Sequence, residues 1–196
     1  MAIRIRAVQT ADEAQSVFRL RYEVYVEELE RTQRYADHSR RTIEEPLDRS
    51  GLLFAAFEGA RVVGTLRINY PRSCDLSDYV ALYQMQRVGG AHPLHTSIVT
   101  KLLVAADKRN TTLGYRLSLA AYQQGLRDNI LFNFIDVYPA RVPFFERLGY
   151  RVHSPVTLHP EYGAVVVMKM DMRDAQHFHS IGSPFLRFLQ RARAAA

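Results

Sequence analysis

The first part of the chain contains three patterns of apolar and polar residues. From Ala2 to Val8 the two kinds alternate, which predicts a strand. Thr10 and Glu13 have the spacing of a capping box, and apolar residues then recur at helical intervals, so we expect a helix that runs to about Leu29. Gln33 to Ser50 is polar and has no regular period, which predicts a long loop. Long loops in compact domains are often functional.

The rest of the chain predicts strands interleaved with helices. We expect strands at Leu52 to Phe57, Val62 to Asn69, Ile98 to Ala105, Ile130 to Val137, Tyr150 to His153 and Ala164 to Met172. We expect helices at Tyr79 to Val88, Leu113 to Arg127, Pro139 to Leu148 and Pro184 to Arg193. This order predicts an α/β (α+β) fold with a mixed sheet. We expect one domain at residues 1–173 and a basic amphipathic tail at 174–196.

Composition narrows the class of protein. Of the 196 residues 47% are apolar, which is enough for a sizeable core. Cys74 is the single cysteine, so no internal disulfide can form and a reducing compartment is expected. The opening residues contain no long apolar segment, and no apolar run is long enough to cross a bilayer, so we expect no signal peptide and a cytoplasmic protein.

The formal net charge is +6, from 26 Lys and Arg against 20 Asp and Glu. Such a charge attracts three kinds of partner. They are nucleic acid, an anionic membrane, and an acidic protein or small molecule. The sequence contains neither zinc-finger spacing nor an RNA-binding aromatic signature, so we expect no nucleic acid and no metal. An anionic membrane and an acidic protein or small molecule both stay open as partners.

The segment from Ser97 to Leu126 predicts a buried strand, a polar turn and a helix. The first turn of a helix has free backbone N–H groups and the positive end of the helix dipole, which suit a phosphate. Lys108 and Arg109 add positive charge there, and Gly114 would let a phosphate approach the backbone. By spacing alone, an ordinary strand–turn–helix with a basic loop explains the pattern equally well.

Two motifs favour the first interpretation. Arg109-Asn-Thr-Thr-Leu-Gly114 resembles the Arg/Gln-x-x-Gly-x-Gly/Ala loop of the GNAT acyltransferases, and Pro139 to Tyr150 resembles their short helix with a Phe/Tyr-x-x-x-Gly-Phe/Tyr ending. The resemblance implies a mixed, mostly antiparallel central sheet flanked by helices. It also implies that the loop binds the pyrophosphate of coenzyme A or the phosphopantetheine arm of an acyl carrier protein. No tightly bound cofactor is implied.

A narrower resemblance is to the long-chain N-acyl amino acid synthases and the related acyl-homoserine lactone synthases. It rests on Leu20-Arg21-Tyr-Glu-Val-Tyr25, on the acidic loop Glu44-Glu45-Pro-Leu-Asp48 and on Gly64-Thr-Leu-Arg67. The resemblance implies transfer of a fatty acyl group from acyl carrier protein, or from acyl-CoA, to the α-amine of an amino acid.

Two departures refine this expectation. Thr112 stands where the first glycine of the loop is usual, which disfavours coenzyme A more than a carrier protein with its single phosphate. The lactone synthases have Glu-x-x-Arg on the central strand and a tryptophan near the start, whereas this chain has Ile98 and Lys101 and contains no tryptophan. The amino acid synthase branch is therefore favoured.

By this resemblance, the thioester carbonyl of the acyl donor would accept a hydrogen bond from a backbone N–H at about Leu103 to Ala105. The expected donor-binding residues are Leu103, Val104, Ala105, Lys108, Arg109, Thr112 and Gly114. The candidate catalytic residues are Glu45, Asp48, His95 and Tyr150, and His153 is a further candidate for the proton of the amine. Each candidate also has a purely structural interpretation. Glu45 and Asp48 could be solvated loop acids, His95 a surface histidine and Tyr150 a core aromatic residue.

Arg21 and Arg67 each interrupt an apolar stretch, and buried arginine needs an anionic partner. Either they form structural ion pairs with Glu45 or Asp48, or they bind the carboxylate of the acceptor. For the acyl chain, a dry slot is required. The candidate lining residues are Phe132, Phe134, Phe144 and Phe145, and ordinary core packing is the alternative for each of them.

The basic tail from Phe185 to Arg193 is expected to touch an acidic carrier protein or the inner membrane, or to be a solvated helix docked on the core. Two other functions stay open at this point. One is a small-molecule N-acetyltransferase that uses acetyl-CoA, and the other is a non-catalytic module of the same fold that binds an acyl carrier or a lipid.

Overall fold

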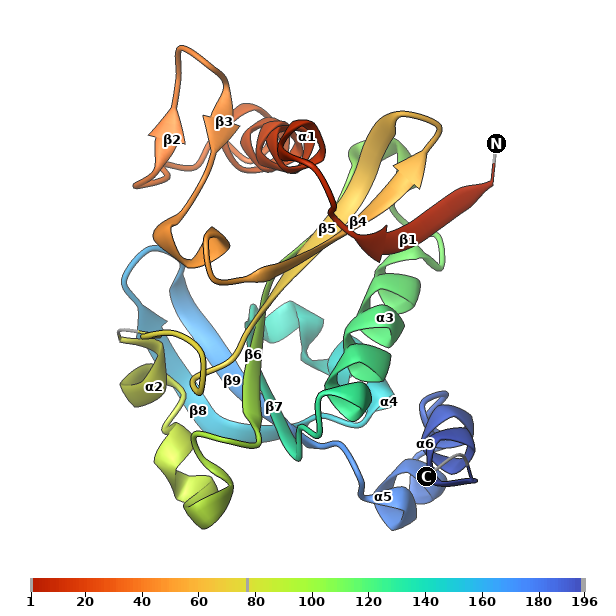
Figure 1. The fold of residues 1–196 in the computed structure, drawn as a ribbon. Coiled ribbons are helices and arrows are strands. Elements are labelled where there is room, and N and C mark those ends of the chain that lie inside the picture. The colour runs from red at the N-terminus through yellow and green to blue at the C-terminus, as the bar shows by residue number, and fades with distance from the viewer. Residues whose placement is uncertain (1, 77, 195–196) are drawn as a thin grey trace. The chain divides into compact units, whose positions relative to one another are not determined.

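The computed structural model describes residues 2–76 and 78–194 (Figure 1). Within them, seven strands form one sheet in the order β1-β4-β5-β6-β7-β9-β8, and β2 and β3 form a separate ladder. The pairs β1–β4, β4–β5, β7–β9 and β8–β9 are antiparallel, whereas β6 and β7 run parallel. This mixed, mostly antiparallel sheet flanked by helices confirms the expected fold class.

The chain divides into two compact units. The first comprises Met1–Asn69 and Val99–Ala121, and the second comprises Tyr70–Ile98 and Tyr122–Ala196. Strand β6 (Thr96–Val104) and helix α3 (Leu113–Arg127) contribute residues to both units. The expected tail begins inside the second unit, and its last two residues lie outside the described part of the chain.

The first unit holds the N-terminal half of the fold. Its other elements are β1 (Ile3–Ala7), α1 (Ala11–Tyr22), β2 (Ala36–Asp37), β3 (Thr42–Ile43), β4 (Leu52–Glu58) and β5 (Arg61–Asn69). The Thr10 hydroxyl accepts the Glu13 N–H at 3.2 Å, so α1 begins at the predicted cap. The predicted helix continues beyond α1 as a π-helical segment, Glu23–Glu28, whose wider turns the apolar spacing did not indicate.

Strand β5 buries both apolar and polar side chains in the first unit. All of its residues except Arg61 are buried, on both faces of the strand. Its apolar members join the core, but Thr65, Arg67 and Asn69 are each 0% exposed as well. Polar groups buried in this way need partners, so β5 brings a polar site into the interior of the unit.

The second unit holds the C-terminal half of the fold. Its other elements are α2 (Tyr79–Leu82), β7 (Phe132–Val137), α4 (Val142–Leu148), β8 (Arg151–His159), β9 (Gly163–Asp171), α5 (Ala175–Ser180) and α6 (Leu186–Ala194). Helix α4 ends at Gly149, as predicted. Gly149 has a φ of 122°, and a Cβ there would lie 2.3 Å from the Phe178 ring, so conformation and packing both require glycine.

Three expectations for this unit need correction. The helix expected at Tyr79 to Val88 stops at Leu82, because Gln84 adopts a left-handed φ of 48° and a 3-10 segment, Met85–Ala91, follows. Strand β8 runs on past His153 to His159 through two bulges beside β9. Helix α5 was not predicted. It begins at Asp174, whose side chain accepts the His177 N–H at 2.9 Å.

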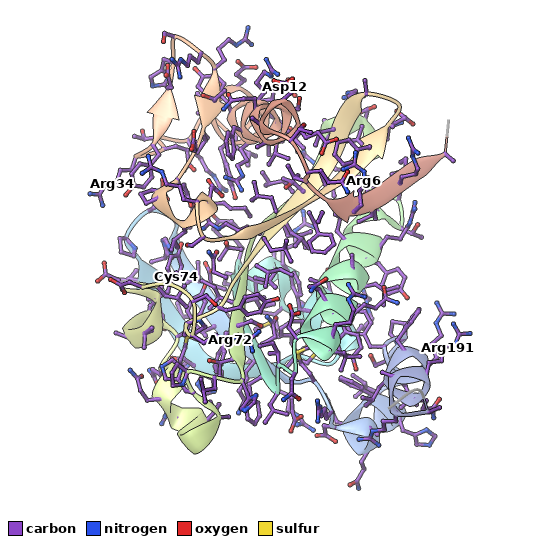
Figure 2. The ribbon with its side chains drawn as sticks, viewed as in Figure 1. Arg6, Asp12, Arg34, Arg72, Cys74 and Arg191 are labelled. Carbon is purple, nitrogen blue, oxygen red and sulfur yellow. The ribbon has the colours of Figure 1, made fainter. Side chains whose placement is uncertain are left out.

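The tail residues pack onto the second unit. Phe178, Phe185 and Leu189 are buried, and the ring of Phe185 stacks on Tyr122 with centroids 4.5 Å apart. The opposite side of α6 carries exposed arginines, among them Arg191 (Figure 2). The amphipathic pattern of the tail therefore corresponds to a helix docked by its apolar face, with its basic face in solvent.

Candidate functional site

The acidic loop and the two predicted arginines meet in a buried ionic cluster in the first unit. The Arg21 Nη1 and Nη2 atoms lie 2.7 and 2.9 Å from the Asp48 carboxylate oxygens. The Arg67 Nη1 atom donates to Glu45 Oε2 at 2.8 Å and to Asp48 Oδ1 at 3.0 Å. The ion pairs expected between the arginines and this loop are therefore present. We call these four residues, together with Lys101, the ionic cluster.

The backbone of the loop fixes the two carboxylates. Pro46–Asp48 is a 3-10 turn in which the Glu45 N–H donates to Asp48 Oδ2 at 2.7 Å. Gly51 follows, and a Cβ at this position would lie 2.8 Å from the Arg67 Cγ and 2.8 Å from the Leu47 carbonyl oxygen. Only glycine lets the loop lie this close to the arginine. The close contact at Gly51 therefore helps to fix the Arg67 side chain, whose guanidinium faces Glu45 and Asp48.

Lys101 is the member of the cluster to which the sequence analysis assigned no role. Its ammonium group forms an ion pair with Glu45 Oε1 and lies 5.3 Å from the centre of the Tyr25 ring. It stands in β6 with a left-handed φ of 56°, which is uncommon for a lysine and costs about 1–3 kcal/mol. The signal in the sequence was a lysine as the one charged residue of this strand.

The cluster holds its acids ionised. Burial by itself would raise the pKa of Glu45, but Lys101 and Arg67 outweigh it and hold that pKa below its ordinary value. Burial also opposes ionisation of Asp48, and the Arg21 guanidinium outweighs it and lowers the pKa of this carboxyl too. Carboxylates with lowered pKa values are poor proton acceptors at neutral pH, so both are better suited to binding a cation than to removing its proton.

The predicted donor-binding residues form one continuous segment of the first unit, from Leu103 at the end of β6 to Gly114 in the first turn of α3. Gly64 on β5 supports this segment closely, because a Cβ there would lie 3.1 Å from the Leu103 carbonyl oxygen. The Ala105 N–H donates to Val63 O at 3.0 Å. It is thus engaged within the sheet, unlike the free N–H that a thioester carbonyl requires.

The cations of the donor segment are paired with acids. Lys108 lies 2.8 Å from Glu58, and the Arg109 guanidinium binds both carboxylate oxygens of Glu28. The Arg109 Nε atom also donates to Val104 O at 3.2 Å, which holds the side chain along the segment. An anionic ligand would exchange with Glu28 at this guanidinium.

The start of α3 leaves room for a ligand. The Thr111 hydroxyl accepts the Leu113 N–H at 3.2 Å, and the Thr112 carbonyl accepts the Arg116 N–H at 2.9 Å, so these threonines begin the helix. A Cβ on Gly114 would meet no described atom within 4 Å. Packing inside the unit therefore gives no reason for glycine here, which leaves approach of a ligand as a reason.

Tyr150 heads a buried hydrogen-bond chain in the second unit. Its hydroxyl donates to Asn133 Oδ1 at 2.5 Å, and Asn133 Nδ2 donates to Ser97 Oγ at 2.7 Å. Burial raises the pKa of the Tyr150 hydroxyl, so it stays protonated at neutral pH and acts as a neutral hydrogen-bond donor. The sequence did not indicate its two partners.

The two histidine candidates lie in the same unit. The His95 Nδ1 atom lies 2.9 Å from the Asn129 carbonyl oxygen, and its backbone carbonyl accepts the N–H groups of Leu131 and Phe132. His95 immediately precedes β6, whereas the donor segment begins at the other end of that strand. His153 packs edge-on against Phe134 at 5.3 Å, and burial lowers its pKa.

The four phenylalanines predicted to line an acyl slot lie in separate surroundings. Phe144 and Phe145 contact each other edge-on, and Phe145 also contacts Tyr150. Phe132 and Phe134 alternate with Asn133 on β7 and so project from the opposite face of that strand. Phe145, through Tyr150, lies on the Asn133 side. The two pairs thus do not share one surface of β7.

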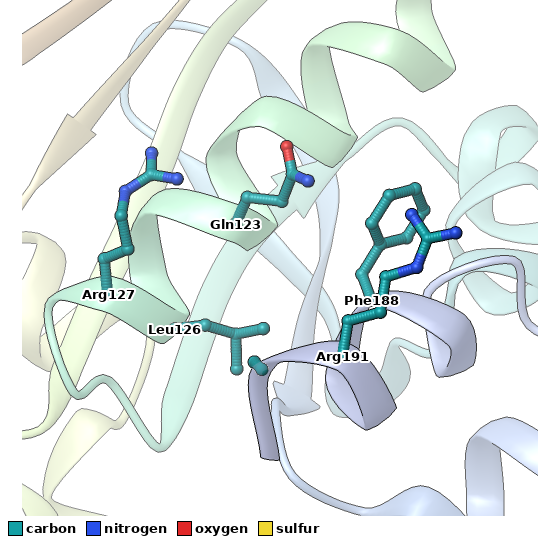
Figure 3. A pocket seen from close by; sticks show the side chains of 6 residues that line it. Gln123, Leu126, Arg127, Phe188 and Arg191 are labelled. Carbon is teal, nitrogen blue, oxygen red and sulfur yellow. The ribbon is translucent and has the colours of Figure 1, made fainter. Parts of the chain in front are cut away.

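The tail and the second half of α3 line a hollow within the second unit (Figure 3). Its apolar lining residues are Leu126, Phe188 and Ala192, and its polar ones are Gln123, Arg127 and Arg191. The Arg191 guanidinium is 5.9 Å from the centre of the Phe188 ring. No acidic residue occurs between Ala175 and Ala194, so this surface favours an anionic partner.

Two features are absent from the described residues 2–76 and 78–194. Among them, no helix has both the length and the apolar composition needed to cross a bilayer. The same residues contain no group of three or more His, Cys, Asp or Glu side chains that could hold a metal ion.

Comparison with known proteins identifies the family. The profile of the N-acyl amino acid synthase FeeM matches residues 16–171. The solved structure of FeeM, from uncultured soil microbes, has a TM-score of 0.71 and 15% identity over 95% of this chain and 98% of that chain. BjaI, a CoA-dependent acyl-homoserine lactone synthase solved with SAM and isopentyl-CoA, has a TM-score of 0.72 and 19% identity over 98% and 100%.

More distant structures share the fold as well. ElaA of Escherichia coli has a TM-score of 0.62 and 13% identity over 86% of this chain and 99% of that chain. No curated protein sequence matches the chain. At these identities the structural likenesses show the fold, whereas the profile match covers most of the sequence and confirms the resemblance read from its motifs. The chain therefore belongs to the FeeM family of N-acyl amino acid synthases, and it is an N-acyltransferase.

Proposed function

We propose that this enzyme transfers a long-chain fatty acyl group from acyl carrier protein to the α-amine of an amino acid. The observation that carries the donor half is the start of α3. Gly114 faces open space there, five residues after Arg109 of the cationic pair Lys108 and Arg109. A phosphate at this position would meet helix N–H groups and exchange with Glu28 at the Arg109 guanidinium.

The acceptor half rests on the ionic cluster. Arg21, Arg67 and Lys101 supply three cations against the two carboxylates of Glu45 and Asp48. The carboxylate of an amino acid would be attracted by the cations of this cluster, and its ammonium group by the carboxylates of the loop. In this proposal Arg21 and Arg67 act as parts of the cluster that binds the acceptor.

The reaction needs a deprotonated amine, a stabilised oxyanion and a protonated leaving thiol. The amine nitrogen attacks the thioester carbonyl, the carbon–sulfur bond breaks, and the carrier thiolate leaves. We assign the oxyanion to a backbone N–H at Leu103 or Val104, because the Ala105 N–H is engaged with Val63. Glu45 and Asp48, held ionised, would bind the ammonium, which loses its proton directly to water. The thiolate takes its proton from water, and Tyr150, held protonated, is our candidate to donate a hydrogen bond to the leaving sulfur.

A carrier protein also fits the basic tail. Carrier proteins are acidic, and Arg187, Arg191 and Arg193 lie on a segment without acidic residues. We expect Arg187→Ala combined with Arg191→Ala to raise the KM for palmitoyl carrier protein several-fold and to leave the KM for palmitoyl-CoA unchanged. Equal effects on the two donors would reject carrier docking on this helix.

The function is tested with purified enzyme, a panel of amino acids and three donors in parallel. The donors are palmitoyl carrier protein, palmitoyl-CoA and acetyl-CoA. We expect release of free thiol that requires an amino acid and is fastest with the carrier protein. Mass spectrometry of the product should find an N-palmitoyl amino acid. Turnover with palmitoyl-CoA alone would mean that the donor is an acyl-CoA and not an acyl carrier protein, as in the CoA-dependent relative BjaI. Turnover with acetyl-CoA alone would overturn the proposal.

A further inference from the structure

Strand β5 carries two buried polar atoms of opposite character that have no hydrogen-bond partner among the described residues. One is the donor Nη2 of Arg67, and the other is the acceptor Oδ1 of Asn69. Both residues are 0% exposed. Leaving a buried polar atom without a partner is costly, so a complementary pair of such atoms needs an explanation.

The two side chains lie on the same face of β5. Residues two apart on a strand project to the same side, about 6–7 Å apart along the strand. Their surroundings agree, because the Asn69 Nδ2 atom donates to Leu47 O at 2.9 Å. The Gly51 position that touches the Arg67 Cγ also touches this same carbonyl oxygen. The free donor and the free acceptor therefore border the acidic loop together.

The charge beside them is not balanced. The ionic cluster buries three cations, and within the described chain their ion-pair partners are the two carboxylates of Glu45 and Asp48. The cluster thus has one positive charge in excess. A buried charge without a counterion is costly, and one additional carboxylate would neutralise it.

We propose that Arg67 and Asn69 together recognise the zwitterion of an α-amino acid acceptor. The carboxylate of the acceptor accepts from Arg67 Nη2, and its amino group donates to Asn69 Oδ1. Lys101 supplies the excess charge that makes the carboxylate obligatory. This inference rests on the proposed function, since it identifies the chemical group of the acceptor that the same site reads.

Asn69 is a binding residue in this scheme, and its amide suits the task. An amide oxygen accepts a hydrogen bond from an ammonium or a neutral amine but does not take its proton. The amine can therefore lose its proton elsewhere while its position stays fixed. Proximity and orientation of this kind account for much of the rate enhancement in acyl transfer.

The test separates the two halves of the zwitterion with matched ligands. It uses the panel amino acid with the lowest KM, its decarboxylated amine as a substrate and its desamino acid as a competitive inhibitor. For phenylalanine these are phenethylamine and hydrocinnamate. In the wild-type enzyme we expect each truncated ligand to bind at least tenfold more weakly than the amino acid.

Two variants then address one half each. Asn69→Leu should raise the KM for the amino acid about tenfold and leave the inhibition constant of the desamino acid unchanged. Lys101→Met should weaken the desamino acid about tenfold and leave the KM of the decarboxylated amine unchanged. The double variant Lys101→Met with Glu45→Gln restores one excess positive charge and should recover carboxylate binding.

Thr65→Val is the matched structural control. Thr65 is buried on the same face of β5, and its hydroxyl donates to Phe54 O at 2.9 Å. This isosteric change should lower Tm without changing the KM of the acceptor. If Asn69→Leu weakens the amino acid and the desamino acid equally, or neither of them, the inference is overturned. The transfer reaction would survive that result, whereas absence of any amino acid turnover would overturn the proposed function itself.

Discussion

The first unit contains two groups of ion pairs that differ in burial. In the ionic cluster, the Arg21 and Asp48 side chains are 0% and 2% exposed, whereas those of Arg109 and Glu28 in the donor segment are 35% and 34% exposed. Solvent and salt screen the exposed pair, so its net stabilisation is small and its partners exchange easily. The buried cluster is screened little, so its geometry is fixed.

This difference matches the two tasks that we propose. A carrier protein must bind and leave in each turnover, so the cations that hold its phosphate should trade partners at little cost. The amine must be held in one orientation, so the groups around it should not move. Substitutions in the two groups of ion pairs should therefore have different consequences. Those in the buried pairs should lower stability, and those in the exposed pairs should change the affinity for the donor.

The largest effect is expected from Asp48→Asn. This change leaves the buried guanidinium of Arg21 without a counterion and removes one partner of Arg67. Breaking a buried pair costs about 3–5 kcal/mol, which lowers Tm by roughly 6–20 °C in a protein of this size. Asp107→Asn, which breaks the exposed pair with Arg61, is the matched control and should barely move Tm. Thermal unfolding followed by circular dichroism measures both, and equal shifts would contradict the contrast.

Acid should act on the same cluster. The pKa values of Asp48 and Glu45 lie below their ordinary values in the fold, because the cationic neighbours outweigh burial. Such groups contribute stability that is fully present above the unfolded-state pKa of about 4 and is lost as pH falls further. We expect the free energy of unfolding, from urea titrations, to fall by a few kcal/mol between pH 5 and pH 3. The fall should be shallower in Asp48→Asn, and parallel curves would show that other acids cause it.

Arg109→Ala should affect binding more than folding. We expect the KM for the acyl donor to rise about tenfold while Tm changes little, since the Arg109–Glu28 pair is partly exposed. Glu28→Gln should do the opposite, because it frees the guanidinium and lowers the KM for the donor. Steady-state kinetics at two salt concentrations would check both variants. An unchanged donor KM in Arg109→Ala would remove the phosphate from this site.

The smallest effect is expected at Gly114. Because a Cβ there meets no described atom within 4 Å, Gly114→Ala should fold normally and gain a few tenths of a kcal/mol from its helix propensity. The KM for the donor should nevertheless rise a few-fold, since the methyl group takes space from the phosphate. Tm and donor KM measured on the same preparation test this. A lower Tm with an unchanged KM would mean that the glycine serves the fold.

Local patterns predicted much of the fold. The capping pair Thr10 and Glu13 began α1, and the apolar period predicted α3 with the bounds that the structure has. These elements depend on neighbours within a turn or two, which a sequence displays directly. The unpredicted features depend on distant partners. Helix α2 ends early, at Leu82, and β8 extends beyond His153 because β9 pairs with it.

The candidate site divides in the same way. Motif order indicated the donor segment and the acidic loop, and interrupted apolar runs indicated Arg21 and Arg67. Asn69 carried a weak signal, as the last of three polar residues at alternate positions of β5. Nothing near Tyr150 indicated Asn133 as its partner, because the two residues are 17 positions apart in the sequence.

The sequence by itself determined the order of the elements, the family and the chemical kinds of group available for catalysis. Periodicity, caps and motifs are local, and local interactions can be read along a chain. Only the tertiary structure decided which charges share one interior, that three cations there face two carboxylates, and which buried atoms lack a partner. Those properties depend on burial and on contacts between distant segments, since the energy of a charge is set by what surrounds it and not by its place in the sequence.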